Sequence, residues 1–222
     1  MRKTSFLLFC LVVLGLVGRA MPVSAEWFAD LYIGPAFTQS DTAAGIKYRF
    51  DNVFSGGGRA GYYFESIPWL GLGFDVSHYQ PDGKASGFNF DDGIHGITGR
   101  IVRQPDGKAS GLNFDARITA LSFDAMLRLP LLTSKEFPAG QLRPYATVGP
   151  GVYFTDAKGG GLSASDTTAG VKAGLGAVWM LHPLVGLMAE YRFSHTRPGS
   201  QGVHVDVNTH RLQFGLTFRF GL

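Results

Sequence analysis

Ser194 and His195 are adjacent in this 222-residue chain, and a serine and a histidine can act as the nucleophile and the general base of a hydrolase. A hydrolase needs its nucleophile within hydrogen-bond distance of a general base. The pair falls in a predicted β-strand, where neighbouring side chains point to opposite faces. These two residues are therefore poorly placed to activate each other. We predict no catalytic residues, and a hydrolase is a less favoured alternative.

Metal and cofactor chemistry has weaker candidates. His204, Asp206 and His210 lie close together near the C-terminus, and imidazole and carboxylate groups can bind a metal ion. We expect these residues to be isolated and exposed, and Asp91-Asp92 lacks the ligand series of a calcium loop. The glycines occur in predicted strands without a following helix, so no phosphate-binding loop is indicated. We predict no metal site and no cofactor.

A two-residue period in hydrophobicity indicates which elements position these side chains. Residues 70–77, 121–129 and 211–220 are apolar at alternate positions and polar or small at most of the others. This period places the two sets on opposite faces of a strand. A soluble β-sandwich would show the same alternation, so the period alone does not separate a soluble protein from a membrane protein.

The longest uncharged stretch after the N-terminal region, residues 173–189, is the main evidence for a membrane-spanning helix. Glycines and His182-Pro183 interrupt it, so two strands joined by a tight turn describe it better. The other structure that a bilayer admits is a closed barrel, whose strands need about 9 to 11 residues per crossing. The sequence therefore favours a barrel.

The predicted strands alternate between short and long connections, which is the asymmetry of outer-membrane barrels. The long polar connections lie at about 39–51, 80–115, 156–167 and 196–207. We predict an all-β fold: an eight-stranded antiparallel transmembrane β-barrel with short periplasmic turns and long extracellular loops. The strands are predicted at about 27–38, 52–65, 69–79, 116–130, 142–155, 168–181, 184–195 and 208–221.

The first 25 residues have the features of a secretory signal peptide. Arg2 and Lys3 precede an apolar run over residues 6–17, and the small residues Val23-Ser24-Ala25 offer a cleavage site. We predict that residues 1–25 are removed and that residues 26–222 form one barrel domain. Export of this kind places the protein in the outer membrane if the barrel prediction is right.

Removal of the signal peptide changes the charge of the chain. Three of its 20 basic residues and none of its 17 acidic residues lie in that segment, so the formal net charge falls from +3 to zero. A neutral chain does not indicate nucleic-acid binding. The only cysteine, Cys10, is lost as well, so the exported protein has no disulfide.

Charged residues occupy the polar face of the predicted strands, which faces the lumen if the apolar face contacts lipid. An eight-stranded barrel is just wide enough for side chains to fill it, and charges away from water must pair. We therefore predict an ion-paired plug; a conduction path and the solvated surface of a soluble sandwich are the alternatives. The predicted lumen residues are Asp30, Arg59, Glu65, Asp75, Asp124, Arg128, Arg143, Lys172, Glu190, Arg192, Arg211 and Arg219.

Aromatic residues gather near the predicted strand ends, as expected at the two membrane interfaces. Trp27, Trp69 and Trp179 lie near predicted periplasmic ends. Tyr79, Tyr153, Phe154 and Phe193 lie toward the outer side. We predict that these side chains anchor the barrel in the membrane.

The second long loop contains a tandem duplication of twelve residues. Residues 80–91 and 104–115 differ only at Phe88 and Leu112. Pro-Asp-Gly forms turns, and Asn-Phe-Asp in each copy could extend a hairpin above the membrane. The loop is either a contact surface for an extracellular ligand or a neutral insertion. The turn residues of the repeat are Pro81, Asp82, Gly83 and Lys84 in one copy and Pro105, Asp106, Gly107 and Lys108 in the other.

The ends of the predicted barrel carry a family resemblance. Residues 189–193, 208–212 and 214–220 resemble the last hairpin of the opacity-protein or outer-membrane-protein-A-like β-barrel family, and residues 27–34 resemble its first strand. The resemblance implies an eight-stranded outer-membrane barrel that is inserted by the barrel-assembly machinery. That machinery usually recognises a final aromatic residue, whereas this chain ends Phe220-Gly221-Leu222.

The family does not fix one activity, because its members include adhesins, resistance factors, structural proteins and small pores. Our leading hypothesis is a non-enzymatic membrane protein whose barrel anchors exposed loops for surface interaction or envelope integrity. A small passive channel is the alternative, and an outer-membrane hydrolase or a soluble periplasmic sandwich is less favoured. The expected partners are outer-membrane lipid, the barrel-assembly machinery and an unidentified extracellular ligand.

Overall fold

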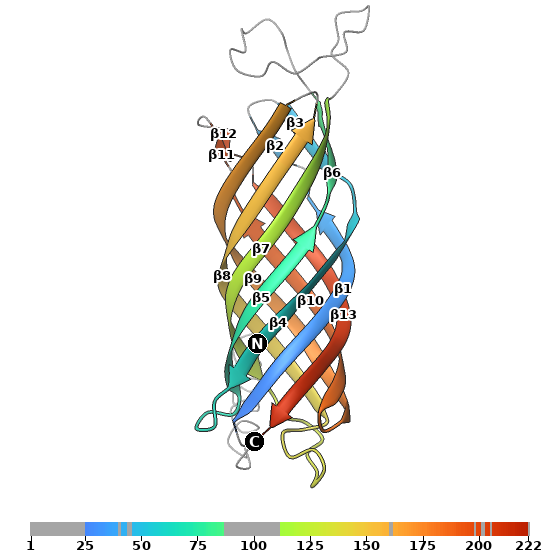
Figure 1. Cartoon of the computed structure of the whole chain (residues 1–222), viewed down its shortest axis with the longest axis vertical. Coiled ribbons are helices and arrows are strands. Elements are labelled where there is room, and N and C mark those ends of the chain that lie inside the picture. Colours follow the sequence, from blue (N-terminus) through green and yellow to red (C-terminus); the bar gives the residue numbers. More distant parts are fainter. Residues whose placement is uncertain are drawn as a thin grey trace, which may run out of the picture.

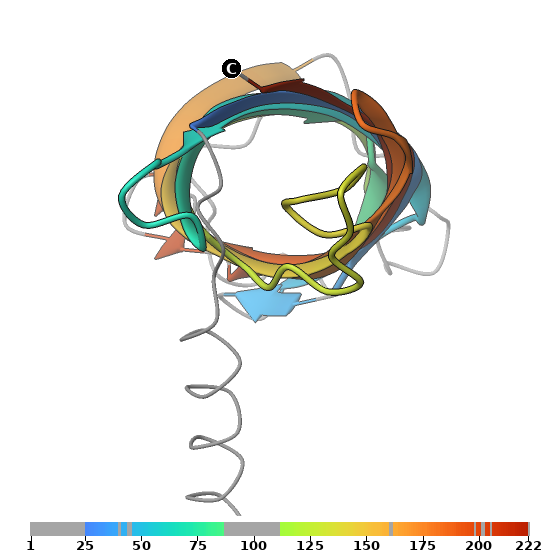
Figure 2. The same cartoon turned by 90° about the horizontal axis from the view of Figure 1, so that it is seen from below.

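Strands in which polar and apolar residues alternate close into a barrel in the computed structural model of this chain (Figures 1 and 2). The structure describes residues 25–39, 41–43, 46–86, 112–159, 162–197, 199–200, 203–204 and 206–221. No helix in this part of the chain is long and apolar enough to span a membrane. The predicted signal peptide, except for Ala25, lies outside the described residues.

Eight strands form the wall, and each one pairs antiparallel with its neighbour along the chain. The last strand pairs with the first, from Glu26 opposite Gly221 to Thr38 opposite Thr209, and this seam closes the barrel. In order around the wall, the strands are β1 (Glu26–Thr38), β4 (Val53–Tyr63), β5 (Leu70–Tyr79), β7 (Leu112–Arg128), β8 (Leu142–Gly159), β9 (Leu162–His182), β10 (Val185–Thr196) and β13 (Val207–Gly221).

The prediction of an eight-stranded antiparallel barrel is confirmed, but several strands are longer than predicted. β7 begins at Leu112 and β9 at Leu162, because their residues continue to pair with neighbouring strands beyond the predicted membrane edge. Five short strands lie in the long connections: β2 (Asp41–Ala43), β3 (Ile46–Phe50), β6 (Asp82–Ser86), β11 (Gly199–Ser200) and β12 (Val203–His204). The strands β2, β3 and β6 extend the sheet beside β7.

The barrel has two unlike ends. Residues 64–69, 129–141 and 183–184 connect the strands at one end, which we call the turn end (Figure 1). The other end, the loop end, holds the connections over residues 39–52, 80–111, 160–161 and 197–206. The prediction of a long connection at 156–167 is wrong, because β8 and β9 continue to pair as far as Gly159 and Leu162. Side chains alternate between the two faces of the wall. Apolar side chains such as Leu31, Phe74 and Phe214 are exposed on the outside, while polar side chains such as Asp124 are buried inside.

Two Gly-Pro steps interrupt the hydrogen-bonded ladder without shifting its register. Gly34-Pro35 in β1 and Gly149-Pro150 in β8 lie where pairing with one neighbouring strand is broken for two residues and then resumes. Proline has no N–H to donate. A Cβ on Gly149 would lie 2.0 Å from the Phe123 carbonyl oxygen, so only glycine fits beside that strand.

Candidate functional site

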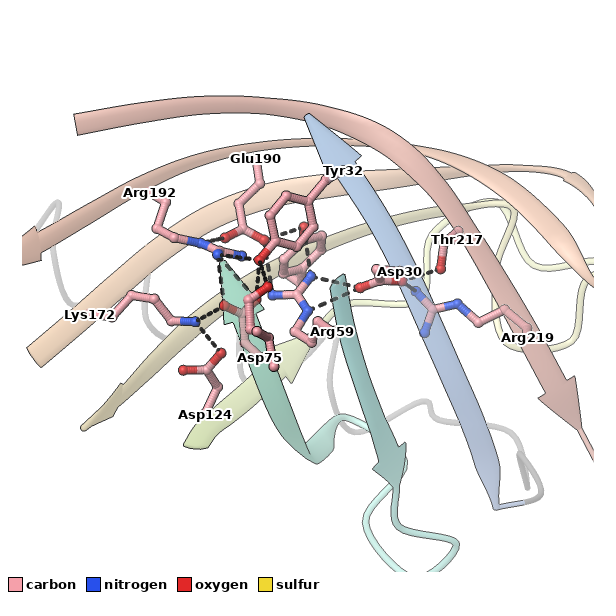
Figure 3. A network of polar contacts seen from close by, with 12 residues as sticks. Asp30, Tyr32, Arg59, Asp75, Asp124, Lys172, Glu190, Arg192, Thr217 and Arg219 are labelled. Carbon is pink, nitrogen blue, oxygen red and sulfur yellow. Dashed lines mark hydrogen bonds and ion pairs between the residues drawn. The ribbon is translucent and has the colours of Figure 1, made fainter. Parts of the chain in front are cut away.

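A network of buried charges crosses the centre of the barrel (Figure 3). Arg59 on β4 contacts Asp30 on β1 at 2.8 Å and Glu190 on β10 at 3.0 Å. Each of these three side chains is at most 1% exposed. Because β4 and β10 are not adjacent in the wall, the contact between Arg59 and Glu190 ties distant strands together through the lumen. Thr217 on β13 adds a hydrogen bond by donating to Asp30.

The network continues toward the loop end through a second arginine. Arg192 contacts Glu190 at 2.6 Å and Asp75 at 3.1 Å. Lys172 on β9 then joins Asp75 at 3.1 Å and Asp124 on β7 at 2.7 Å. Every carboxylate in this chain of contacts faces at least one cation, which is the condition for keeping charges away from water.

Two tyrosines complete the central network. The hydroxyl of Tyr32 donates to Asp75 at 2.7 Å, and the hydroxyl of Tyr145 donates to Glu190 at 2.7 Å. Glycines make room for these rings: a Cβ on Gly176 would lie 2.6 Å from the Tyr145 ring, and Gly57 is similarly close to Tyr32. Neither tyrosine was among the predicted lumen residues. Their position on the same strand face as Asp30 and Arg143 was the available signal.

A separate cluster lies at the turn end. Arg128 and Arg143 contact Glu26 at 2.7 and 2.8 Å, and Arg219 reaches the same carboxylate at 3.4 Å. The Arg128 guanidinium lies 3.7 Å from the centroid of the Tyr63 ring, a cation–π contact. All three arginines were among the predicted lumen residues, whereas Glu26 was not.

One predicted lumen residue is misplaced. Glu65 is exposed in the turn after β4, which ends at Tyr63. The prediction extended the strand by two residues, and the inward alternation no longer applies once the strand has ended. The other eleven predicted lumen residues are buried inside the barrel.

The connection between β7 and β8 folds across part of the opening at the turn end (Figure 2). Phe137 is 8% exposed and packs with the buried residues of the lumen. The Phe137 N–H donates to the Ser134 hydroxyl at 3.0 Å, and the Arg143 side chain donates to the Gly140 carbonyl at 2.7 Å. Gly140 has a φ of 89°, a conformation that favours glycine. This turn therefore covers the Glu26 cluster.

An apolar and aromatic cluster lies inside the loop end, beside buried polar side chains such as Thr38 and Thr209. Tyr79 and Tyr153 are 3% and 2% exposed and pack with Ala36, Ile118 and Ala120. We call these five residues the aromatic roof. The expectation that the two tyrosines lie among the membrane-anchoring aromatics is wrong, because both project into the barrel.

Beneath the aromatic roof lies the remaining predicted lumen residue, Arg211, which is fully buried. It donates to the Ser77 hydroxyl at 2.9 Å and to the Ser194 hydroxyl at 3.4 Å. Its guanidinium lies 5.4 Å from the centroid of the Tyr79 ring.

The predicted interface tryptophans are exposed on the outer wall. Trp27, Trp69 and Trp179 are 54%, 36% and 44% exposed, and all three lie near the turn end. Trp27 packs against Tyr62 with ring centroids 4.8 Å apart. Their role in anchoring the barrel in the membrane stays a prediction.

The duplicated loop is described only in part. In the first copy, the described residues extend to Ser86. Residues Asp82–Ser86 form β6, which pairs with Leu112 to Asp115 of the second copy. In this register Ala85 lies opposite Leu112 and Asp82 lies opposite Asp115. Pro105, Asp106, Gly107 and Lys108 lie outside the described residues.

The candidate catalytic pair does not come together. Ser194 is buried and receives a hydrogen bond from Arg211 inside the barrel. His195 lies on the outer face, where its Nδ1 is 2.7 Å from the Asn208 amide oxygen. His210 contacts Tyr191 and Gln39. Among the described residues, no group of three or more His, Cys, Asp or Glu side chains is arranged to hold a metal ion.

A closed antiparallel barrel with an apolar outer face and a charged interior defines the class of outer-membrane β-barrel proteins. The outer membrane protein beta-barrel domain family model matches residues 9–220, and the chain belongs to this family. The comparison with curated proteins finds no match.

Solved structures show the same fold. The crystal structure of Neisserial surface protein A (NspA) matches with a TM-score of 0.52 and 16% identity, over 88% of this chain and 97% of that one. The crystal structure of the outer membrane protein OprG from Pseudomonas aeruginosa matches with a TM-score of 0.56 and 11% identity, over 90% of this chain and 98% of that one. The likeness to these two structures shows the barrel fold.

Proposed function

We propose that this protein is a non-enzymatic, non-conducting barrel that anchors its extracellular segments in the outer membrane. The observation that carries the proposal is the network of buried charges across the lumen. Asp30, Arg59, Glu190 and Arg192 are each at most 3% exposed and linked by direct contacts. An ion moving through the barrel would have to break these contacts in a medium of low dielectric constant.

Both mouths of the lumen support the same proposal. In this proposal the turn end faces the periplasm and the loop end faces the exterior. The turn containing Phe137 lies over part of the opening at the turn end, and the aromatic roof lies inside the loop end. An eight-stranded barrel holds little space beyond its own side chains. Three successive layers thus oppose conduction.

The wall itself supports an anchoring role. A crossing needs about 9 to 11 residues, whereas β7, β8 and β9 have 17, 18 and 21. Outward-facing residues of β9 are apolar at Val171, Leu175 and Trp179 but polar at Ser165 and Thr167. This side of the barrel therefore continues beyond the apolar band, and β2, β3 and β6 widen it (Figure 1). The projecting sheet presents the duplicated loop to an extracellular ligand.

Single-channel recording tests the proposal. Protein purified from outer membranes is added to a planar bilayer, and its folded state is checked by heat-modifiable gel migration. We expect no discrete conductance steps. A deletion of residues 88–111 is the matched control. If the lumen blocks conductance, this variant should also show no steps, whereas steps that appear only after the deletion would mean that the long loop blocks the barrel. Stable steps that change with Arg128→Ala or Glu190→Ala would overturn the proposal and establish a small passive pore.

Surface labelling tests the orientation of the anchor. An epitope inserted between Gly87 and Phe88 should bind antibody on intact cells. The same epitope inserted between Ser134 and Lys135, in the turn that contains Phe137, should bind only after the outer membrane is permeabilised. Labelling in the opposite order would contradict the proposed display of the long loops.

A further inference from the structure

Arg211 is a buried cation without an acidic partner. It is 0% exposed, and its two hydrogen-bond acceptors are the hydroxyls of Ser77 and Ser194. No carboxylate contacts it among the residues that the structure describes. An isolated buried charge costs several kcal/mol unless a counter-charge or strong hydrogen bonds compensate it.

The described interior also carries an excess of positive charge. Seven buried bases face five buried acids, which leaves two positive charges in excess. The bases are Arg59, Arg128, Arg143, Lys172, Arg192, Arg211 and Arg219, and the acids are Glu26, Asp30, Asp75, Asp124 and Glu190. Arg211 is the base in this set that has no acid within salt-bridge distance, so the excess charge is partly located there.

Unused N–H donors surround the same position. Arg211 Nε, Arg192 Nη2 and Gln213 Nε2 are all buried without a hydrogen-bond partner. Arg192 and Arg211 are direct cross-strand partners on β10 and β13, and Gln213 lies two residues from Arg211 on the same face. The register therefore places the three side chains next to one another on the inner face of β10 and β13.

We propose that this region binds one small inorganic anion, such as chloride. The anion would accept hydrogen bonds from the two guanidinium groups and the Gln213 amide, and it would offset the charge of Arg211. A cation would be repelled by the two arginines. The central network below and the aromatic roof above limit the occupant to a small ion.

Chloride-dependent stability tests the site. The purified protein in detergent is unfolded by heat across a chloride titration, with gluconate as the replacement anion at constant ionic strength. We expect the Tm to rise by about 3 °C for each tenfold increase in chloride above the dissociation constant. Arg211→Met should abolish this dependence. Arg143→Met is the matched control: it removes another buried arginine, at the turn end, and should retain the dependence.

Three results would overturn the proposal: a wild-type Tm that does not depend on chloride, a dependence that survives in Arg211→Met, or a dependence that only Arg143→Met removes. The last result would place the anion at the Glu26 cluster. If Arg211→Met does not fold, diffraction from wild-type crystals grown in bromide decides the question. The site requires an anomalous peak within hydrogen-bond distance of Arg211 Nε, and no peak there would refute it.

Discussion

The centre of the lumen and its loop end hold buried arginines in two different ways. Arg59 lies between Asp30 and Glu190, and its charge is compensated by the protein itself. Arg211 lies under the aromatic roof with two serine hydroxyls and, within the part of the chain that the structure describes, no carboxylate. The comparison suggests that the charges at the centre close the lumen and stabilise the barrel, whereas the loop end can bind a small anion.

Loss of a paired arginine should have the largest effect. Arg59→Ala removes the nearest cation of the buried Asp30 and one of the two cations that contact the buried Glu190, so we expect the free energy of unfolding to fall by about 3–5 kcal/mol. Urea unfolding in lipid vesicles, followed by tryptophan fluorescence, measures this change. Arg197→Ala is the control, because Arg197 is 66% exposed and 3.5 Å from Asp206. Equal effects of the two substitutions would mean that the central network does not stabilise the barrel.

A methyl group added at the centre should have the next largest effect. Gly176→Ala places a Cβ 2.6 Å from the Tyr145 ring, and we expect a loss of about 1–3 kcal/mol from overpacking. Gly56→Ala is matched in type and strand context, but the nearest atom to its Cβ is the Tyr32 carbonyl oxygen at 3.7 Å. Unfolding curves of the two variants should differ clearly; indistinguishable curves would show that the lumen repacks around the added methyl.

Loss of the unpaired arginine should be much milder. In buffer without small anions, Arg211→Met removes a charge but leaves no carboxylate uncompensated, so we expect a change of about 1 kcal/mol or less. The same urea series gives the value. A loss as large as that of Arg59→Ala would abolish the distinction between the centre and the loop end.

Deletion of residues 88–111 should have the smallest effect. It joins Gly87 to Leu112 and restores one uninterrupted copy of the repeat. Since Ala85 pairs with Leu112, Ser86 and Gly87 would form a two-residue connection between β6 and β7. Connections as short as two residues depart from the simple loop-closure scaling, and the deletion keeps the pairing of β6 with β7, so heat-modifiable migration and the urea midpoint should be nearly unchanged. A lost barrel band would show that the duplicated segment supports the wall.

The strands and the lumen face could be predicted because both follow from a two-residue period. Asp75, Asp124 and Arg192 share the parity of other polar residues on their strands, and the structure buries all three. Glu65 is an even number of residues from Arg59 and would face inward if the strand continued. Side chains alternate between the two faces only within a strand, however, and β4 ends at Tyr63. Glu26 is an even number of residues from Asp30 and faces inward as Asp30 does. It was not predicted as a lumen residue because it lies one residue before the predicted start of its strand.

The partners of each charge could not be predicted from the sequence. Arg59 meets Glu190 and Tyr145 because of the tilt and stagger of the closed wall, which no local pattern specifies. The position of Phe137 inside the turn end depends on the turn that includes Gly140, and composition does not reveal where such a turn folds. The family resemblance agreed with the number of strands read from the sequence but specified no lumen contact.

The seam between β1 and β13 makes the wall cyclic, since Glu26 lies directly opposite Gly221. A short linker could therefore join these two positions, and new chain ends could be opened between Gly87 and Phe88. Such a circular permutant would keep every strand pair and would also preserve the contact of Glu26 with Arg219. In this barrel, the order of the strands around the wall determines the fold, and the strand at which the chain begins is interchangeable.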